Sequence, residues 1–191
     1  MKKKIFYIAA IVICLAILSG GTLAYYNASD TARNVITSGK VELVLLEQQR
    51  VGDQVTPYPA QPVSVMPGKT VSKIVSVRND AQPAWIRVSY TVTVYDADGN
   101  KKEIPAEEQD AAIIIEPDST NWFYRDGWWY YSAALATGET TRPLFDEVRF
   151  SATNMDNQYQ RCSIVIDVTA QGVQRANNGE TALEALGWPE S

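Results

Sequence analysis

The sequence predicts an all-β protein: a jelly-roll-like antiparallel β-sandwich with a short C-terminal helix, preceded by an N-terminal signal-peptide helix. Short runs rich in Val, Ile, Thr and aromatic residues recur after residue 40, and turn-forming residues separate them. One of these runs alternates between apolar and polar side chains, as a half-buried strand does. The chain has 191 residues, of which 46% are hydrophobic and 20% charged. That is enough apolar material for one packed core.

The first 24 residues are typical of a secretory signal peptide. Three lysines precede an apolar run at residues 5–18, and small residues then lead to Ala24. Cleavage between Ala24 and Tyr25 would leave an acidic mature protein, because only lysines are removed from a chain of 17 basic and 22 acidic residues. The apolar run is shorter than the roughly 20 residues that cross a bilayer as a helix. Extended to Tyr26 it just reaches that length, so an uncleaved membrane anchor is the alternative.

Three segments follow from this division: a signal peptide at 1–24, a mature N-terminal segment at 25–36 and a β-sandwich domain at 37–191. We expect eight strands in the domain, at residues 41–46, 71–77, 85–95, 113–115, 122–124, 128–131, 147–152 and 162–170. Asp98-Gly99 and Asp126-Gly127 suit tight hairpin turns, because both residue types tolerate a positive φ.

Three stretches depart from the strand pattern. Residues 50–63 contain three prolines, and half of residues 99–110 are charged, so both are predicted to be surface loops. Residues 178–187 predict a short helix, which Asn178 or Thr181 can cap and which Gly187 would end.

The absence of histidine excludes several chemistries. A Ser-His-Asp triad, a Cys-His dyad and a His-ligated zinc site all need that residue. Cys14 falls in the signal peptide, and Cys162 begins an apolar strand, which favours a buried, inert thiol. The acidic balance and scattered basic residues disfavour nucleic acid as a partner. We therefore expect no enzyme, no catalytic residue, no metal site and no cofactor.

A partial calcium-loop pattern lies between residues 96 and 107. Asp96, Asp98, Asn100 and Glu107 occupy the first, third, fifth and twelfth positions of such a loop. Lys101 stands where the sharp turn requires Gly, and a strand rather than a helix precedes the loop. A solvated hairpin loop is therefore favoured over a calcium site.

The densest aromatic feature is the segment from Asn121 to Tyr131. A hairpin with Asp126 and Gly127 at its turn would pair Tyr124 with Trp129, Trp122 with Tyr131, and Phe123 with Tyr130. Both faces of this hairpin would be aromatic, so one is expected to enter the core. The other would meet a loop, a partner subunit or a ligand, and a glycan-binding platform would use Trp122, Trp128 and Trp129.

Several segments resemble the TasA/camelysin family of Gram-positive bacteria. The most specific are GGTLAYYN at residues 20–27 and NVITSGKVEL at residues 34–43. Weaker similarities follow at residues 66–69, 77–79, 84–88 and 126–145. Together these segments span most of the mature chain.

The resemblance implies a secreted jelly-roll subunit of the cell surface or of extracellular biofilm fibres. It implies processing by a SipW-type signal peptidase, and assembly with itself or with related matrix subunits. The freed N-terminal segment would then complete the sheet of the next subunit, because an open sheet edge accepts a donated strand. Tyr25, Tyr26, Val35 and Ile36 are the strand-forming residues of that donor, whereas residues 27–34 are polar enough for a linker. Membrane contact is expected only through an uncleaved signal segment, and a surface adhesin or carbohydrate-binding module is the alternative function.

Overall fold

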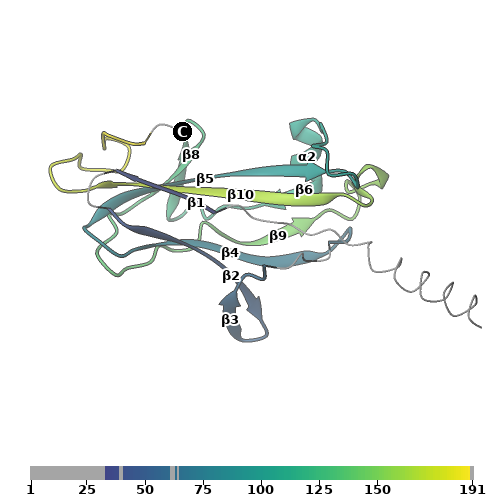
Figure 1. The fold of residues 1–191 in the computed structure, drawn as a ribbon, viewed down its shortest axis with the longest axis horizontal. Helices are drawn as coiled ribbons and strands as arrows, with labels where there is room; N and C mark the ends of the chain where they lie inside the picture. Colours follow the sequence, from purple (N-terminus) through teal and green to yellow (C-terminus); the bar gives the residue numbers. More distant parts are fainter. Residues whose placement is uncertain (1–32, 39–40, 61–62, 64, 190–191) are drawn as a thin grey trace, which may run out of the picture.

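Two five-stranded sheets pack face to face in the computed structural model (Figure 1). The structure describes residues 33–38, 41–60, 63 and 65–189. For residues 33–38 it describes the backbone alone. The strand order of the first sheet, sheet A, is β1-β10-β5-β8-β7, and that of the second, sheet B, is β3-β2-β4-β9-β6. The predicted all-β antiparallel sandwich is therefore confirmed. No helix in the described ranges is long and apolar enough to cross a membrane.

Sheet A is built around two long central strands. Its strands are β1 (Arg33–Ser38), β10 (Ser163–Gln174), β5 (Ala84–Tyr95), β8 (Trp128–Tyr131) and β7 (Trp122–Arg125). β10 and β5 pair antiparallel over twelve residues, from Ser163 opposite Tyr95 to Gln174 opposite Ala84. β1 pairs with β10 in parallel, whereas the other pairings in both sheets are antiparallel.

Sheet B carries a hairpin that extends below the sandwich in Figure 1. Its strands are β3 (Gln54–Pro57), β2 (Leu43–Val51), β4 (Thr70–Asn79), β9 (Phe145–Phe150) and β6 (Ile113–Ile115). β2 and β3 form the extending hairpin, with Gly52 at its turn in the left-handed region, at a φ of 61°. The short helix α2 (Ala106–Ala112) leads directly into β6, and a 3₁₀ turn spans Asn157–Tyr159.

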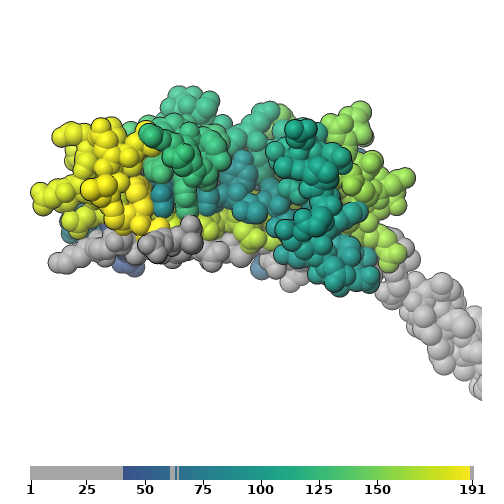
Figure 2. Space-filling model, turned by 90° about the horizontal axis from the view of Figure 1, so that it is seen from above, coloured from purple at the N-terminus to yellow at the C-terminus, as the bar shows by residue number. Residues whose placement is uncertain are grey.

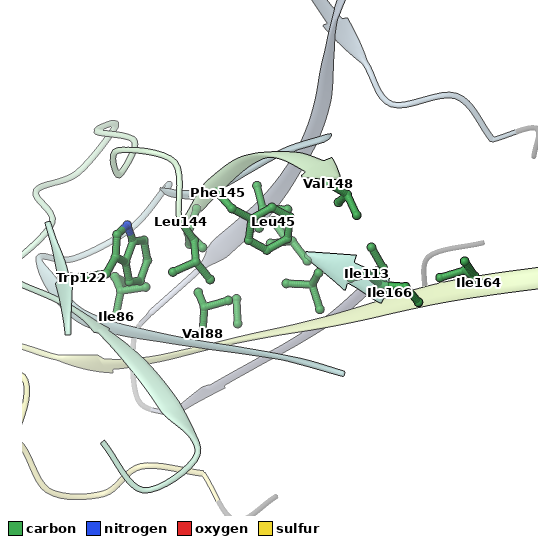
Figure 3. Close-up of a cluster of buried hydrophobic side chains, with 14 of the residues drawn as sticks. Leu45, Ile86, Val88, Ile113, Trp122, Leu144, Phe145, Val148, Ile164 and Ile166 are labelled. Atoms are coloured by element: carbon green, nitrogen blue, oxygen red, sulfur yellow. The ribbon is translucent and has the colours of Figure 1, made fainter. Parts of the chain in front are cut away.

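The apolar side chains at alternate positions of the strands fill the space between the sheets. In β10, Ile164, Ile166 and Val168 are buried, and β5 presents Ile86 and Val88 to the same core. Figure 3 shows Trp122 at one end of this cluster, with the isoleucines of β6 and β10 at the other. Burial of these side chains is the main favourable contribution to the free energy of folding.

A smaller apolar cluster lies on the outer face of sheet A. Its buried members are Trp85, Tyr130, Val173, Ala182 and Ala185. The C-terminal segment, residues 175–189, supplies the two alanines and packs beside the aromatic hairpin; Figure 2 shows it in yellow against the green hairpin. This segment converts what would be an exposed apolar face into a second, minor core.

Each of the eight expected strands is present, with ends shifted by a few residues, but three expectations about the other segments are wrong. Residues 54–57 form the edge strand β3 rather than part of a loop, and residues 106–112 of the charged segment form α2. Residues 178–187 form turns instead of a helix. Gly179 has a φ of 59°, and the side chain of Asn178 hydrogen-bonds the backbone of Leu186, which folds the chain back on itself.

Candidate functional site

The edge of sheet A formed by β1 is the first candidate site. The register sets Val35 opposite Ala170 and Ile36 opposite Gln171, so these two donor residues lie in a strand paired with β10 of the same chain. Ala24, Tyr25 and Tyr26, the residues of the expected cleavage site and of the donor's start, lie outside the described residues.

Among the residues that the structure describes, β1 has a strand neighbour on one side only. After Ser38 the chain leaves sheet A and enters sheet B at Leu43. Gly172 of β10 packs against the segment that leads into sheet B. A Cβ added to Gly172 would lie 2.8 Å from Leu43 Cδ1 and 3.0 Å from Val41 Cγ1. The sandwich is therefore closed tightly at the corner that follows β1, while β1 itself forms the sheet's edge.

The aromatic hairpin is the second candidate site, and its register is the predicted one. Trp122 pairs with Tyr131, Phe123 with Tyr130 and Tyr124 with Trp129. Their ring centroids lie 4.9, 5.8 and 5.2 Å apart, respectively. Both faces of the hairpin are used, because one row packs on the main core and the other on the outer cluster.

The three tryptophans proposed for glycan contact do not share one surface. Trp122 is 1% exposed, and its indole Nε1 donates a hydrogen bond to the Arg142 carbonyl at 3.1 Å. Trp128 lies in the outer cluster, whereas Trp129 packs on the opposite, core side. A single stacking platform built from all three is therefore absent from this arrangement.

Sequence reasoning overlooked Arg87, which organises the outer face. Its guanidinium lies between two indoles, 4.2 Å from the ring centre of Trp128 and 4.6 Å from that of Trp188. It donates to Oε1 of the fully buried Gln171 from Nε at 2.9 Å and from Nη2 at 2.6 Å, and Nη2 also donates to the Pro189 carbonyl. Arg87 thus holds the C-terminal segment on sheet A. The sequence carries no signal for this role, because Arg87 stands at one of the polar positions of an alternating strand.

Replacing Arg87 with Lys is expected to loosen the C-terminal segment. A lysine retains the charge but cannot fill the planar space between two indoles while donating two hydrogen bonds to one amide oxygen. We expect a loss of about 1–2 kcal/mol in the free energy of unfolding and faster amide exchange in residues 176–189. Arg125→Lys is the matched control, because the side chain of Arg125 is 62% exposed. Equal exchange rates in both variants would contradict the role assigned to Arg87.

The remaining predicted features lie apart from these two sites. The Asp96 carboxylate accepts hydrogen bonds from the backbone N–H groups of Asn100 and Asp98, and the Asn100 backbone contributes most to lowering the pKa of Asp96. In the described part of the chain, no three acidic or cysteine side chains are grouped closely enough to hold a metal ion. Burial raises the pKa of the Cys162 thiol, which donates to the Gln158 carbonyl at 3.3 Å.

Comparison with known proteins gives no relative: no family model, no curated protein and no solved structure matches this chain.

Proposed function

We propose that the protein is a secreted structural subunit of the cell surface or biofilm matrix, which assembles by exchanging its N-terminal strand between copies. The observation that carries the proposal is the placement of β1. This six-residue strand contains Val35 and Ile36 of the expected donor, lies at a sheet edge and, within the described part of the chain, pairs with β10 and no other strand.

Strand exchange needs a strand that can leave without dismantling the core. β1 precedes the main sandwich in the sequence, and the antiparallel pairing of β10 with β5 does not depend on it. Withdrawal of β1 would expose the backbone of β10, an edge that the same segment of a second copy fills with the same register. When each copy donates β1 to one neighbour and accepts it from another, the contact is head-to-tail and generates a filament, whereas reciprocal exchange between two copies would give a closed dimer.

The signal peptide expected at residues 1–24 provides the control of this exchange. While it is attached, the segment before β1 is tethered at the membrane, and cleavage after Ala24 frees it. A SipW-type signal peptidase is the processing partner that the family resemblance suggests, and a sibling matrix subunit is an alternative acceptor.

A cysteine pair tests where β1 pairs. Asn34 and Thr169 are register partners, so N34C and T169C in a C162S chain starting at Tyr25 place two thiols on adjacent strands. After assembly and oxidation, exchange between copies predicts covalent ladders on a non-reducing gel. Oxidation before assembly predicts locked monomers that form filaments only after reduction.

Two further forms serve as controls. A chain lacking residues 25–38 is expected to fold but to form no filaments under electron microscopy or in sedimentation. N34C combined with D53C, in the distant β2–β3 hairpin turn, is expected to give no specific ladder. Filaments from the truncated chain, or filaments whose N34C/T169C crosslinks all lie within one chain, would overturn strand exchange.

A further inference from the structure

A cleft of about 340 Å³ opens where the aromatic hairpin leaves β5, and Tyr90, Tyr124, Gly127 and Trp129 line it. β8 pairs with β5 only at Arg87 and Val88, so the strand diverges just before Tyr90 and leaves this opening. Its volume lies at the lower end of the range for small-molecule sites, roughly 300–1,000 Å³.

The walls of the cleft are aromatic rings held at different angles. The rings of Tyr124 and Trp129 lie 5.2 Å apart and are inclined at 48°. Tyr90 is fixed from behind by an edge contact with Phe145, whose ring centre is 5.4 Å away. Tyr124 is 62% exposed, so it is accessible to a ligand, whereas Trp129 and Tyr90 are anchored against the main core.

The negative charge of Asp110 acts on Tyr90, one of these rings. Burial raises the pKa of the Tyr90 phenol, and the negative charge of Asp110 raises it further, as does Tyr124. Asp110 belongs to α2, which is fixed next to β5 because the side chain of Gln109 donates to the Val92 carbonyl at 3.1 Å. The described residues that line the cleft include no cationic and no amide side chain.

We propose that this cleft binds a small quaternary ammonium group of the choline type. Aromatic faces carry negative electrostatic potential and attract an organic cation within about 6 Å, and the negative charge of Asp110, which acts on Tyr90, adds to that attraction. A neutral sugar would also stack on the rings, but it would gain nothing from the negative charge of Asp110. The inference does not depend on strand exchange, since the cleft lies at the opposite edge of sheet A from β1.

The test is a titration of the ¹⁵N-labelled chain from residue 25 with choline chloride, followed through the Gly127 amide and the Trp129 indole N–H. The matched ligand is 3,3-dimethyl-1-butanol, which has the shape of choline without its charge. We expect choline to bind at least about 5-fold more tightly than this alcohol. Phosphocholine, titrated in parallel, distinguishes a free from a phosphate-linked headgroup, and binding of either supports the proposal.

Three variants locate the contact. Tyr124→Leu removes an exposed ring and is expected to weaken choline binding about 5-fold, and Asp110→Asn about 3-fold. Arg125→Ala, next to Tyr124 but outside the lining, is expected to leave binding unchanged. Equal affinity for the neutral alcohol, no shift at 100 mM choline, binding of glucose in place of choline, or equal losses in the three variants would overturn the proposal.

Discussion

Replacing Lys73 with Met while Glu47 is retained is expected to lower the free energy of unfolding by about 3–5 kcal/mol. The two side chains form an ion pair between β4 and β2, with Nζ and Oε1 2.7 Å apart, and they are 1% and 0% exposed. The Tyr58 ring centre lies 4.2 Å from the ammonium. Removing the lysine would leave a carboxylate in this buried environment without its bonded cation, which is more costly than losing the attraction itself.

The double variant Lys73→Met with Glu47→Leu separates the charge effect from the packing effect. Apolar side chains of similar volume satisfy the site without burying any charge, so most of the stability is expected to return. Urea unfolding followed by circular dichroism gives the free energies of unfolding of the wild type, the single variant and the double variant. The comparison requires that the slope of this free energy against urea concentration is the same for all three. If the double variant is as unstable as the single one, packing around Lys73, and not the buried charge of Glu47, determines the loss.

This buried pair also illustrates a limit of sequence reasoning. Along β2 the core-facing positions are Leu43, Leu45 and Glu47, so a charge occupies a position where the alternation requires an apolar residue. Its partner Lys73 is separated by 26 residues, and only the pairing of β2 with β4 brings the two together. The local pattern therefore shows neither that Glu47 is buried nor that Lys73 is its partner.

The strands were predictable where the local pattern and the tertiary environment agree. The alternation in β5 and β10 fixes which side chains enter the core, and Asp126-Gly127 fixes the register of the aromatic hairpin. β3 was missed because Pro57 disfavours a strand, although a proline at the end of an edge strand is tolerated.

The helical segments show the same contrast. α2 has a recognisable beginning, since Pro105 precedes Ala106 and two acidic residues occupy the first turn, but its charge suggested a loop. At the C-terminus the helical pattern loses to tertiary contacts. Trp85 Nε1 donates a hydrogen bond to the Asn178 carbonyl at 2.9 Å. Ala182 and Ala185 pack in the outer cluster from a segment that is not helical.

The candidate sites depend on pairings that sequence alone does not give. The aromatic hairpin was found from its composition, but the division of its tryptophans between two faces follows from what each face packs against. The edge strand β1 is a second case. Val35 and Ile36 indicated a strand, but its parallel partner, β10, lies more than 130 residues away in the chain, so the sequence alone does not give the pairing.

Replacing Trp122 with Ala is expected to destabilise the protein by about 3–5 kcal/mol. Trp122 is the largest of the side chains that are less than 2% exposed, and it fills the end of the core next to Ile86 and Leu144 (Figure 3). The substitution leaves a large cavity, removes the ring contact with Tyr131 and leaves the Arg142 carbonyl without the indole donor. Trp122 is 1% exposed and belongs to the main core cluster, so the surroundings can collapse only partly around the gap.

Tyr124→Ala is the matched control, because Tyr124 lies on the same strand and the same face but is 62% exposed. It loses one cross-strand ring contact, with Trp129, and is expected to cost about 1 kcal/mol or less. Trp122→Phe retains an apolar ring without the indole N–H and should fall between the two. Urea unfolding by circular dichroism ranks the three variants, and nearly equal losses for Trp122→Ala and Tyr124→Ala would contradict the packing of this hairpin onto the core. The predicted ranking would mean that the hairpin stabilises the core through Trp122, and that Tyr124, which is exposed, is available to bind a ligand.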